Sequence, residues 1–150
     1  MKLVFKYILI SSLLFFTCKL QAQTKQEPPT SRILFVFDAS QSMYGTWESG
    51  KKISIARNYL IHIIDSLEQM PNIQMALRVY GHQSPVPPQD CSDTKLEVPF
   101  RFGNAGDIRQ KLRYLRPKGT TPIAKSLERS ANDFPPCENC RNIIILITDG

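Results

Sequence analysis

Carboxylate and hydroxyl side chains gather at three separated points of this 150-residue chain. The first is the string Asp38, Ser40 and Ser42, whose alternate spacing lets a turning loop aim all three side chains inward. The others are 119–122 (Gly-Thr-Thr-Pro) and 148–150 (Thr-Asp-Gly). Oxygen donors without imidazole or thiolate suit a hard divalent cation, and the small number of carboxylates favours Mg²⁺ or Mn²⁺. We therefore expect a metal site if the fold brings these points together.

Each string by itself is weak evidence for a metal. Short runs of Asp, Ser and Thr with Gly or Pro more often cap a helix or form a turn. The positions of the strings relative to the secondary structure must therefore decide between the two interpretations.

The hydrophobic pattern predicts an alternation of strands and helices. Continuous apolar runs are typical of strands buried on both faces of a parallel sheet, and a 3.6-residue period indicates helices. Strands are expected at 33–37, 73–80, 96–100 and 143–148, and helices at 53–70, 108–115 and 122–131. This order predicts an α/β fold with an open, doubly wound, mostly parallel sheet and helices on both faces.

The direction of each element predicts where the three polar strings lie. If every element reverses the direction of travel, Asp38, the 81–93 loop, 119–122 and Asp149 all arrive at one edge of the sheet, and the 96–100 strand runs antiparallel. Ligands bind at the carboxyl ends of the strands in such sheets. The strings are therefore expected to form one site there.

With these strings in this order, the chain resembles a von Willebrand factor type A (VWA) domain with a metal-ion-dependent adhesion site, over about residues 31–150. DASQS, GTTP and ITDG are similar to the three metal-binding loops of that family. SMYGTW, KKISIAR and RVYGHQ resemble a bacterial secreted subgroup often labelled as homologues of calcium-activated chloride channels, a label that implies no activity.

The resemblance implies a role for each site residue. Ser40, Ser42 and Thr121 would bind Mg²⁺ or Mn²⁺ through their hydroxyls, and Asp38 and Asp149 would act directly or through water. Thr120 is the alternative to Thr121 as the hydroxyl ligand from this segment. The resemblance also implies further strands and helices after the 143–148 strand, so that 31–150 would be the N-terminal part of a domain truncated after its fourth strand.

The first residues predict export across a bacterial inner membrane. Residues 1–22 combine a cationic start, an apolar run at 7–17 and a small residue before a cleavage point, which indicates a signal peptide. The run is shorter than the roughly 20 residues of a spanning helix. A lipoprotein anchored at Cys18 is less favoured, because the flanking residues suit that processing poorly. Residues 23–30 are expected to be a polar tether, and the protein to be secreted or periplasmic.

The charge balance argues against some partners. The chain has 19 Lys and Arg against 13 Asp and Glu, and three of the cations lie within residues 1–22. Nucleic acids and anionic membranes require dense cationic patches. The small remaining excess therefore predicts no nucleic-acid partner.

Three cysteines remain after the leader. Cys137-x-x-Cys140 could be half a zinc site or a redox pair, but a local structural disulfide is the preferred interpretation. Cys91 is expected at the opposite edge of the sheet, about 20 Å away, whereas a disulfide needs Cα atoms about 4.4–6.8 Å apart. We expect its partner after Gly150, where the resembling bacterial proteins often carry cysteines.

These observations favour a metal-dependent protein-binding module for adhesion or assembly, and not an enzyme. The bound ion would complete its coordination with an exposed Asp or Glu of a partner protein. The alternative is a metal-dependent hydrolase that uses Asp38 and Asp149, which is weaker because the motif has no adjacent general acid. A third possibility is a scaffold with a relic site.

Several other residues have a functional and a plain interpretation. Tyr44 and Trp47 could contact a partner or pack the first loop. His82 is expected to make a loop hydrogen bond, and His62 to face solvent. The cations of 109–118 are expected to form a solvated helix face.

Overall fold

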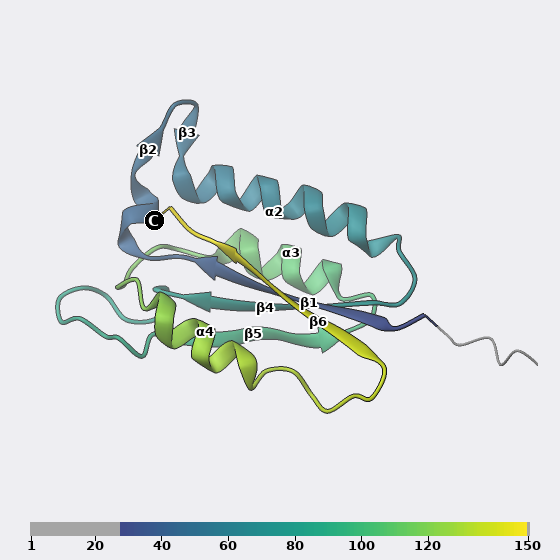
Figure 1. The fold of residues 1–150 in the computed structure, drawn as a ribbon. Helices are drawn as coiled ribbons and strands as arrows, with labels where there is room; N and C mark the ends of the chain where they lie inside the picture. The colour runs from purple at the N-terminus through teal and green to yellow at the C-terminus, as the bar shows by residue number, and fades with distance from the viewer. Residues whose placement is uncertain (1–27, 150) are drawn as a thin grey trace, which may run out of the picture.

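A four-stranded sheet forms the centre of the molecule, in the order β5-β4-β1-β6 (Figure 1). The computed structural model describes residues 28–149, so the predicted signal peptide at 1–22 and most of the tether at 23–30 lie outside the described part. The strands are β1 (Thr30–Asp38), β2 (Thr46–Trp47), β3 (Gly50–Lys51), β4 (Ile73–Tyr80), β5 (Thr94–Arg101) and β6 (Cys140–Ile147). The helices are the 3₁₀ helix η2 (Gln41–Tyr44) and the α-helices α2 (Lys52–Glu68), α3 (Ala105–Tyr114) and α4 (Ile123–Ala131).

The strand directions are those expected from the sequence. β1 pairs in parallel with β4 on one side and with β6 on the other, and β5 pairs with β4 in the antiparallel direction. In the register, Asp38 at the end of β1 faces Tyr80 at the end of β4, and Phe37 faces Ile147. The carboxyl ends of β1, β4 and β6 therefore meet at one edge of the sheet, which we call the rim.

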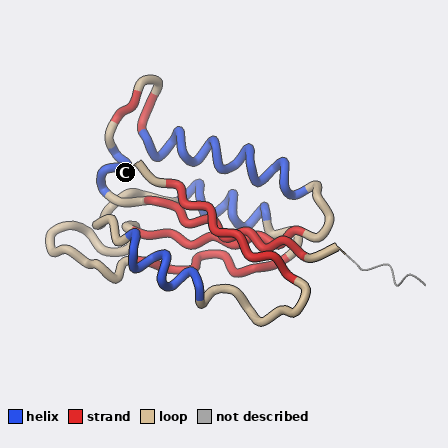
Figure 2. The backbone as a smooth tube through the Cα atoms, in the orientation of Figure 1, coloured by secondary structure: helices blue, strands red, loops and turns tan. Residues whose placement is uncertain are grey.

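Helices cover both faces of the sheet, which confirms the predicted fold class (Figures 1 and 2). Phe35 and Phe37 of β1 belong to the core beneath α2 and α3, whereas Leu34 and Val36 belong to a smaller core with Ile123 at the start of α4. The side chains of β1 from Ile33 to Phe37 are almost completely buried. An apolar run without alternation is therefore buried on both sides, as the pattern predicted.

A short hairpin between β1 and α2 was not expected from the sequence. η2 follows β1 directly, and the two-residue strands β2 and β3 pair antiparallel before α2 begins at Lys52. Segments this short carry no hydrophobic period, because period-2 alternation needs about four residues to become visible. The hairpin projects beyond the rim beside the end of β6 (Figure 1).

The disulfide lies at the edge of the sheet opposite the rim. Cys137 and Cys140 are bonded, with their Cα atoms 5.8 Å apart, and Cys140 pairs with Thr30 at the start of β1. Within residues 28–149, Cys91 is exposed and outside any disulfide. The structure thus contains the predicted local bridge, with Cys91 separate from it.

Strand β6 is the outer strand of the sheet on the side away from β4. Its inward residues pack on the α2 and α3 core, but Ile144 and Leu146 on the other face are 40% and 36% exposed. No helix among residues 28–149 is long and apolar enough to cross a membrane.

Candidate functional site at the rim

Asp38 ties the first strand to the last at the rim. Its carboxylate is completely buried, and one oxygen accepts the Ser40 backbone N–H at 2.8 Å. The other oxygen accepts the Thr148 hydroxyl at 2.9 Å. A buried carboxylate needs such donors to offset its desolvation. Asp38 therefore fixes the loop after β1 against the segment after β6.

A chain of hydrogen bonds joins the hydroxyls of the first loop to the second aspartate. The Oγ atoms of Ser40 and Ser42 are 3.0 Å apart, and the Ser42 hydroxyl donates to Asp149 Oδ1 at 3.0 Å. These contacts arise because η2 begins at Gln41, so the chain turns immediately after Ser40. Four of the five predicted ligands, counting Asp38, are thus linked directly or through one backbone group.

The 119–122 segment lies against the first loop through its backbone. Ser40 and Gly119 form an isolated parallel bridge, and the Gln41 N–H donates to the Gly119 carbonyl at 2.9 Å. The Thr120 hydroxyl donates to the carbonyl of Asp90 at 2.6 Å, so it is engaged with the 81–93 loop. Thr121 is exposed on the same segment. All three predicted strings therefore meet at the rim.

Two further residues hold this meeting point together, and neither was predicted. Gly81 has a φ of +70°, and its carbonyl accepts the Gly119 N–H at 2.9 Å. Asp93 is buried, and one of its oxygens accepts the backbone N–H groups of Gln83 and Ser84, each at 3.0 Å. A glycine directly after a strand was an available signal for Gly81, whereas the sequence offers no comparable signal for Asp93.

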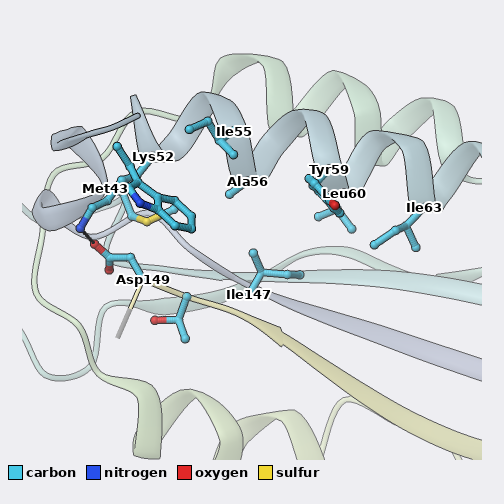
Figure 3. Close-up of a pocket in the computed structure, with 11 residues that line it drawn as sticks. Met43, Lys52, Ile55, Ala56, Tyr59, Leu60, Ile63, Ile147 and Asp149 are labelled. Atoms are coloured by element: carbon cyan, nitrogen blue, oxygen red, sulfur yellow. Dashed lines mark hydrogen bonds and ion pairs between the residues drawn. The ribbon is translucent and has the colours of Figure 1, made fainter. Parts of the chain in front are cut away.

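Lys52, the first residue of α2, forms an ion pair with Asp149 (Figure 3). The ammonium donates to Asp149 Oδ2 at 2.7 Å, and the side chains are 31% and 12% exposed. Burial opposes ionisation of Asp149, but hydrogen bonds from Lys52 and Ser42 outweigh it and lower the pKa of the carboxyl. Sequence reasoning missed Lys52, because nothing in the motif spacing relates a helix start to Asp149.

Behind Asp38 the environment is weakly polar. Burial, together with the nearby charge of Asp38, raises the pKa of Tyr80 well above its usual range, although a contact with Thr148 opposes the shift. The phenol is therefore neutral at every physiological pH. Asp38 and Asp149 are the two carboxylates that accept hydrogen bonds from the first loop, from the Ser40 N–H and the Ser42 hydroxyl.

The donor set fits a small, hard cation. Among residues 28–149, no group of three or more His, Cys, Asp or Glu is arranged to hold a metal. Zinc sites are built from imidazole and thiolate, and calcium sites from several carboxylates. Hydroxyls with two carboxylates leave room for waters, which Mg²⁺ retains when it binds to proteins. The buried position of Asp38 and the Ser40, Ser42 and Asp149 oxygens are thus compatible with Mg²⁺ or Mn²⁺.

His82 belongs to a separate polar cluster behind the rim. Its Nε2 lies 2.9 Å from Glu97 Oε1, and Lys111 Nζ lies 2.7 Å from Glu97 Oε2. Burial opposes ionisation of Glu97, but hydrogen bonds from Lys111, His82 and Lys95 outweigh it and lower the pKa of Glu97 to about 2. His82 therefore makes a hydrogen bond within the fold, as expected.

The remaining candidates divide between exposed and paired. Tyr44 and Trp47 are 46% and 61% exposed beside the rim, so they do not pack the first loop into the core. His62 is exposed on α2, as predicted. Arg109 forms ion pairs with Asp65 and Glu68, and Lys111 is bound to Glu97. The predicted solvated face of α3 is in part an ion-pair network that joins α3 to α2 and β5.

An apolar groove of about 690 Å³ runs between α2 and β6 and reaches the rim at Lys52 and Asp149 (Figure 3). Ile55, Tyr59 and Ile63 of α2 line one side of it, and Ile147 lines the other (Figure 3). The groove was not predicted.

Comparison with known proteins gives a consistent result. Residues 33–150 match the sequence model of the von Willebrand factor type A domain. The protein YwmD of Bacillus subtilis is 29% identical over 125 residues, which are 80% of this chain but only 55% of YwmD. The PilB minor pilin of Streptococcus sanguinis is similar in structure, with a TM-score of 0.64 at 22% identity. The matched region is 83% of this chain and 31% of the pilin chain. BatB of Bacteroides thetaiotaomicron has a TM-score of 0.61 at 17% identity, with coverages of 77% and 52%.

Proposed function

Because the chain belongs to the von Willebrand factor type A domain family, we propose that its rim binds Mg²⁺ or Mn²⁺ and, through that ion, an acidic residue of a partner protein. Ser40, Ser42 and Thr121 contribute hydroxyls, and Asp38 and Asp149 contribute carboxylates directly or through water. Thr121 takes this role in preference to Thr120, whose hydroxyl is bound to the Asp90 carbonyl.

One observation carries the proposal: the Ser40 and Ser42 hydroxyls and the Asp149 carboxylate are linked at 3.0 Å at each step, next to the buried Asp38. Strands β1 and β6 bring these groups together although more than 100 positions separate Ser42 from Asp149. A divalent ion replaces the hydrogen bonds between such oxygens by metal–oxygen bonds and leaves coordination positions for water or a partner carboxylate.

We propose an adhesion or assembly role outside the bacterial inner membrane, for which the predicted signal peptide is the main support. The PilB minor pilin, which shares the fold, belongs to a pilus, an extracellular assembly. The exposed Tyr44 and Trp47 beside the rim would supply apolar contacts around the central carboxylate, because aromatic residues dominate many protein interfaces.

The alternative function is a metal-dependent hydrolase at the same rim. One observation favours it: Lys52 places a cation at Asp149, which the motif spacing did not indicate. Release of phosphate from a model ester such as p-nitrophenyl phosphate, dependent on Mg²⁺ and lost on Asp38→Asn substitution, would support this alternative. We expect no release above background.

The metal part of the proposal is tested by calorimetric titration of Mg²⁺ into the chain from residue 23 and into two matched variants. Ser42→Ala removes a hydroxyl of the rim, whereas Ser66→Ala removes an exposed hydroxyl of α2 that bonds the His62 carbonyl. We expect Ser42→Ala to weaken binding by about tenfold or more, as loss of a hydrogen-bonding or coordinating group worth about 1.4 kcal/mol would do.

The Ser66→Ala variant should bind Mg²⁺ like the parent. Absence of binding in the parent, or equal affinities for the parent and Ser42→Ala, would contradict the proposed metal site.

A further inference from the structure

The ammonium group of Lys52 balances the negative charge of the Asp149 carboxylate, so this carboxylate has a counter-ion from the same chain. The Lys52 ammonium bonds Oδ2 of Asp149, and the Ser42 hydroxyl bonds Oδ1 of the same carboxylate. Both oxygens of this rim carboxylate therefore have partners without any ion. The rim is held together by a chain that starts at Ser40 and ends at an ammonium group.

A divalent ion bound beside the hydroxyls of Ser40 and Ser42 would compete with Lys52 for the Asp149 carboxylate. It would draw on the Asp149 carboxylate, directly or through water, and would place two positive charges close to the ammonium. Repulsion between like charges at such distances is strong in a partly buried site, where the effective dielectric constant is far below that of water. The ion and the Lys52–Asp149 pair are thus unfavourable together.

The Lys52 side chain has room to move away from Asp149. Lys52 lies at the rim end of the groove between α2 and β6, and the side chain is partly exposed (Figure 3). A lysine has a flexible four-carbon stem that can lie along apolar surface while its ammonium remains in water. Release of Asp149 therefore requires only rotation of a side chain, with α2 in place.

We propose that Lys52 is a tethered counter-cation that competes with the divalent ion for Asp149 and so lowers the metal affinity of the rim. This inference rests on the proposed function. In the metal-free protein the Lys52–Asp149 pair keeps the end of β6 attached to the start of α2, and binding of the ion exchanges this pair for metal coordination. Lys52 thus sets the metal affinity of the rim without being a ligand.

The neighbouring lysine provides a matched control. Lys51 carries the same charge one residue earlier, but its ammonium lies 5.4 Å from the centre of the Tyr44 ring. Its side chain does not take part in the hydrogen bonds of the rim described above. Loss of charge at Lys51 alters the net charge of the protein equally, so any difference between the two positions reports contact with Asp149.

The test is calorimetric titration with Mg²⁺ on the chain from residue 23, on Lys52→Met, on Lys52→Arg and on Lys51→Met. We expect Lys52→Met to bind Mg²⁺ about tenfold or more tightly than the parent, and Lys51→Met to differ by less than about twofold. Lys52→Arg keeps the cation and should remain close to the parent.

Thermal melting provides a second readout. Without metal, Lys52→Met should melt below the parent, because Asp149 has lost its ion pair. With Mg²⁺ added, its melting temperature should rise more than that of the parent, since a ligand that binds the native state more tightly stabilises it more. If Lys52→Met is too unstable to titrate, Lys52→Gln provides the same comparison with a polar side chain.

The outcomes separate this inference from the proposed function. Tighter binding by Lys52→Met than by the parent, with Lys51→Met unchanged, supports the counter-cation. Equal or weaker binding by Lys52→Met, in a parent that binds Mg²⁺, overturns the counter-cation and leaves the metal site standing. Absence of binding in every protein overturns the metal site and the counter-cation with it.

Discussion

Replacement of Gly81 by alanine should separate the three loops of the rim. A Cβ atom at this position would lie 2.5 Å from the Thr120 carbonyl oxygen and 2.7 Å from both the N and Cα atoms of Ser40. All three contacts are with backbone, so no side chain can rotate away. Gly81 also has a φ of +70°, which L-residues adopt at a cost.

The magnitude follows from two contributions. The left-handed conformation costs about 1–2 kcal/mol for a residue with a Cβ atom. Displacement of the backbone also weakens hydrogen bonds at Gly81, which accepts the Gly119 N–H at 2.9 Å and donates to the Asp93 carbonyl at 3.0 Å. At about 1 kcal/mol for each bond, the total loss in the free energy of unfolding is about 3–4 kcal/mol. This is a large part of the roughly 5–15 kcal/mol typical of a domain.

The assay is urea denaturation of Gly81→Ala, Gly103→Ala and Gly106→Ala, followed by fluorescence. Gly103 has a φ of +64° with open space around its Cβ position, so its variant measures backbone strain without contact. Gly106 lies in α3 with open space, and its variant should be neutral or more stable. A loss for Gly81→Ala no larger than that for Gly103→Ala would refute the close packing of the rim loops.

Two further predictions concern Glu97 and the outer strand. The pKa of Glu97 falls from 4.5 to about 2 on folding, so its contribution to stability is present above pH 4.5 and is lost as the pH falls toward 2. Solvent screens its partly exposed lysine partners, so the expected effect is about 1.5 kcal/mol: Glu97→Gln should reduce by this amount the loss in the free energy of unfolding between pH 4.5 and pH 2. A pH dependence of stability unchanged from the parent would contradict this. Because Ile144 and Leu146 are exposed on the outer strand, residues 23–150 alone should self-associate in light scattering, and replacement of both by lysine should reduce it. A monomeric parent at the same concentration would show that the exposed outer strand β6 does not cause self-association.

The sequence was informative where hydrophobic pattern and topology act together. The apolar runs that end at Asp38 and Thr148 indicated parallel strands, and counting the direction of each element placed both aspartates at one rim. The structure has these strands and directions. The hydrophobic pattern was sufficient to predict these strands, because a strand buried on both faces must lie inside a sheet that has helices on both sides.

The residues that escaped prediction act through tertiary contacts. Lys52 reaches Asp149 across 97 positions, and Asp93 binds the backbone of its own loop, so neither has a fixed spacing to a motif. The β2–β3 hairpin was missed because strands of two residues show no period. The groove between α2 and β6 depends on how the hairpin and α2 are placed, which no local pattern specifies.

Diffraction from crystals grown with Mn²⁺, with data recorded at the manganese absorption edge, tests the metal site most directly. We predict an anomalous peak at the rim, within metal–oxygen bonding distance of the Oγ atoms of Ser40 and Ser42, with Asp38 and Asp149 bound directly or through water. Lys52 should then have moved away from Asp149. A crystal soaked in excess Mn²⁺ that shows no peak at the rim, with the Lys52–Asp149 pair still in place, would contradict the metal-dependent function.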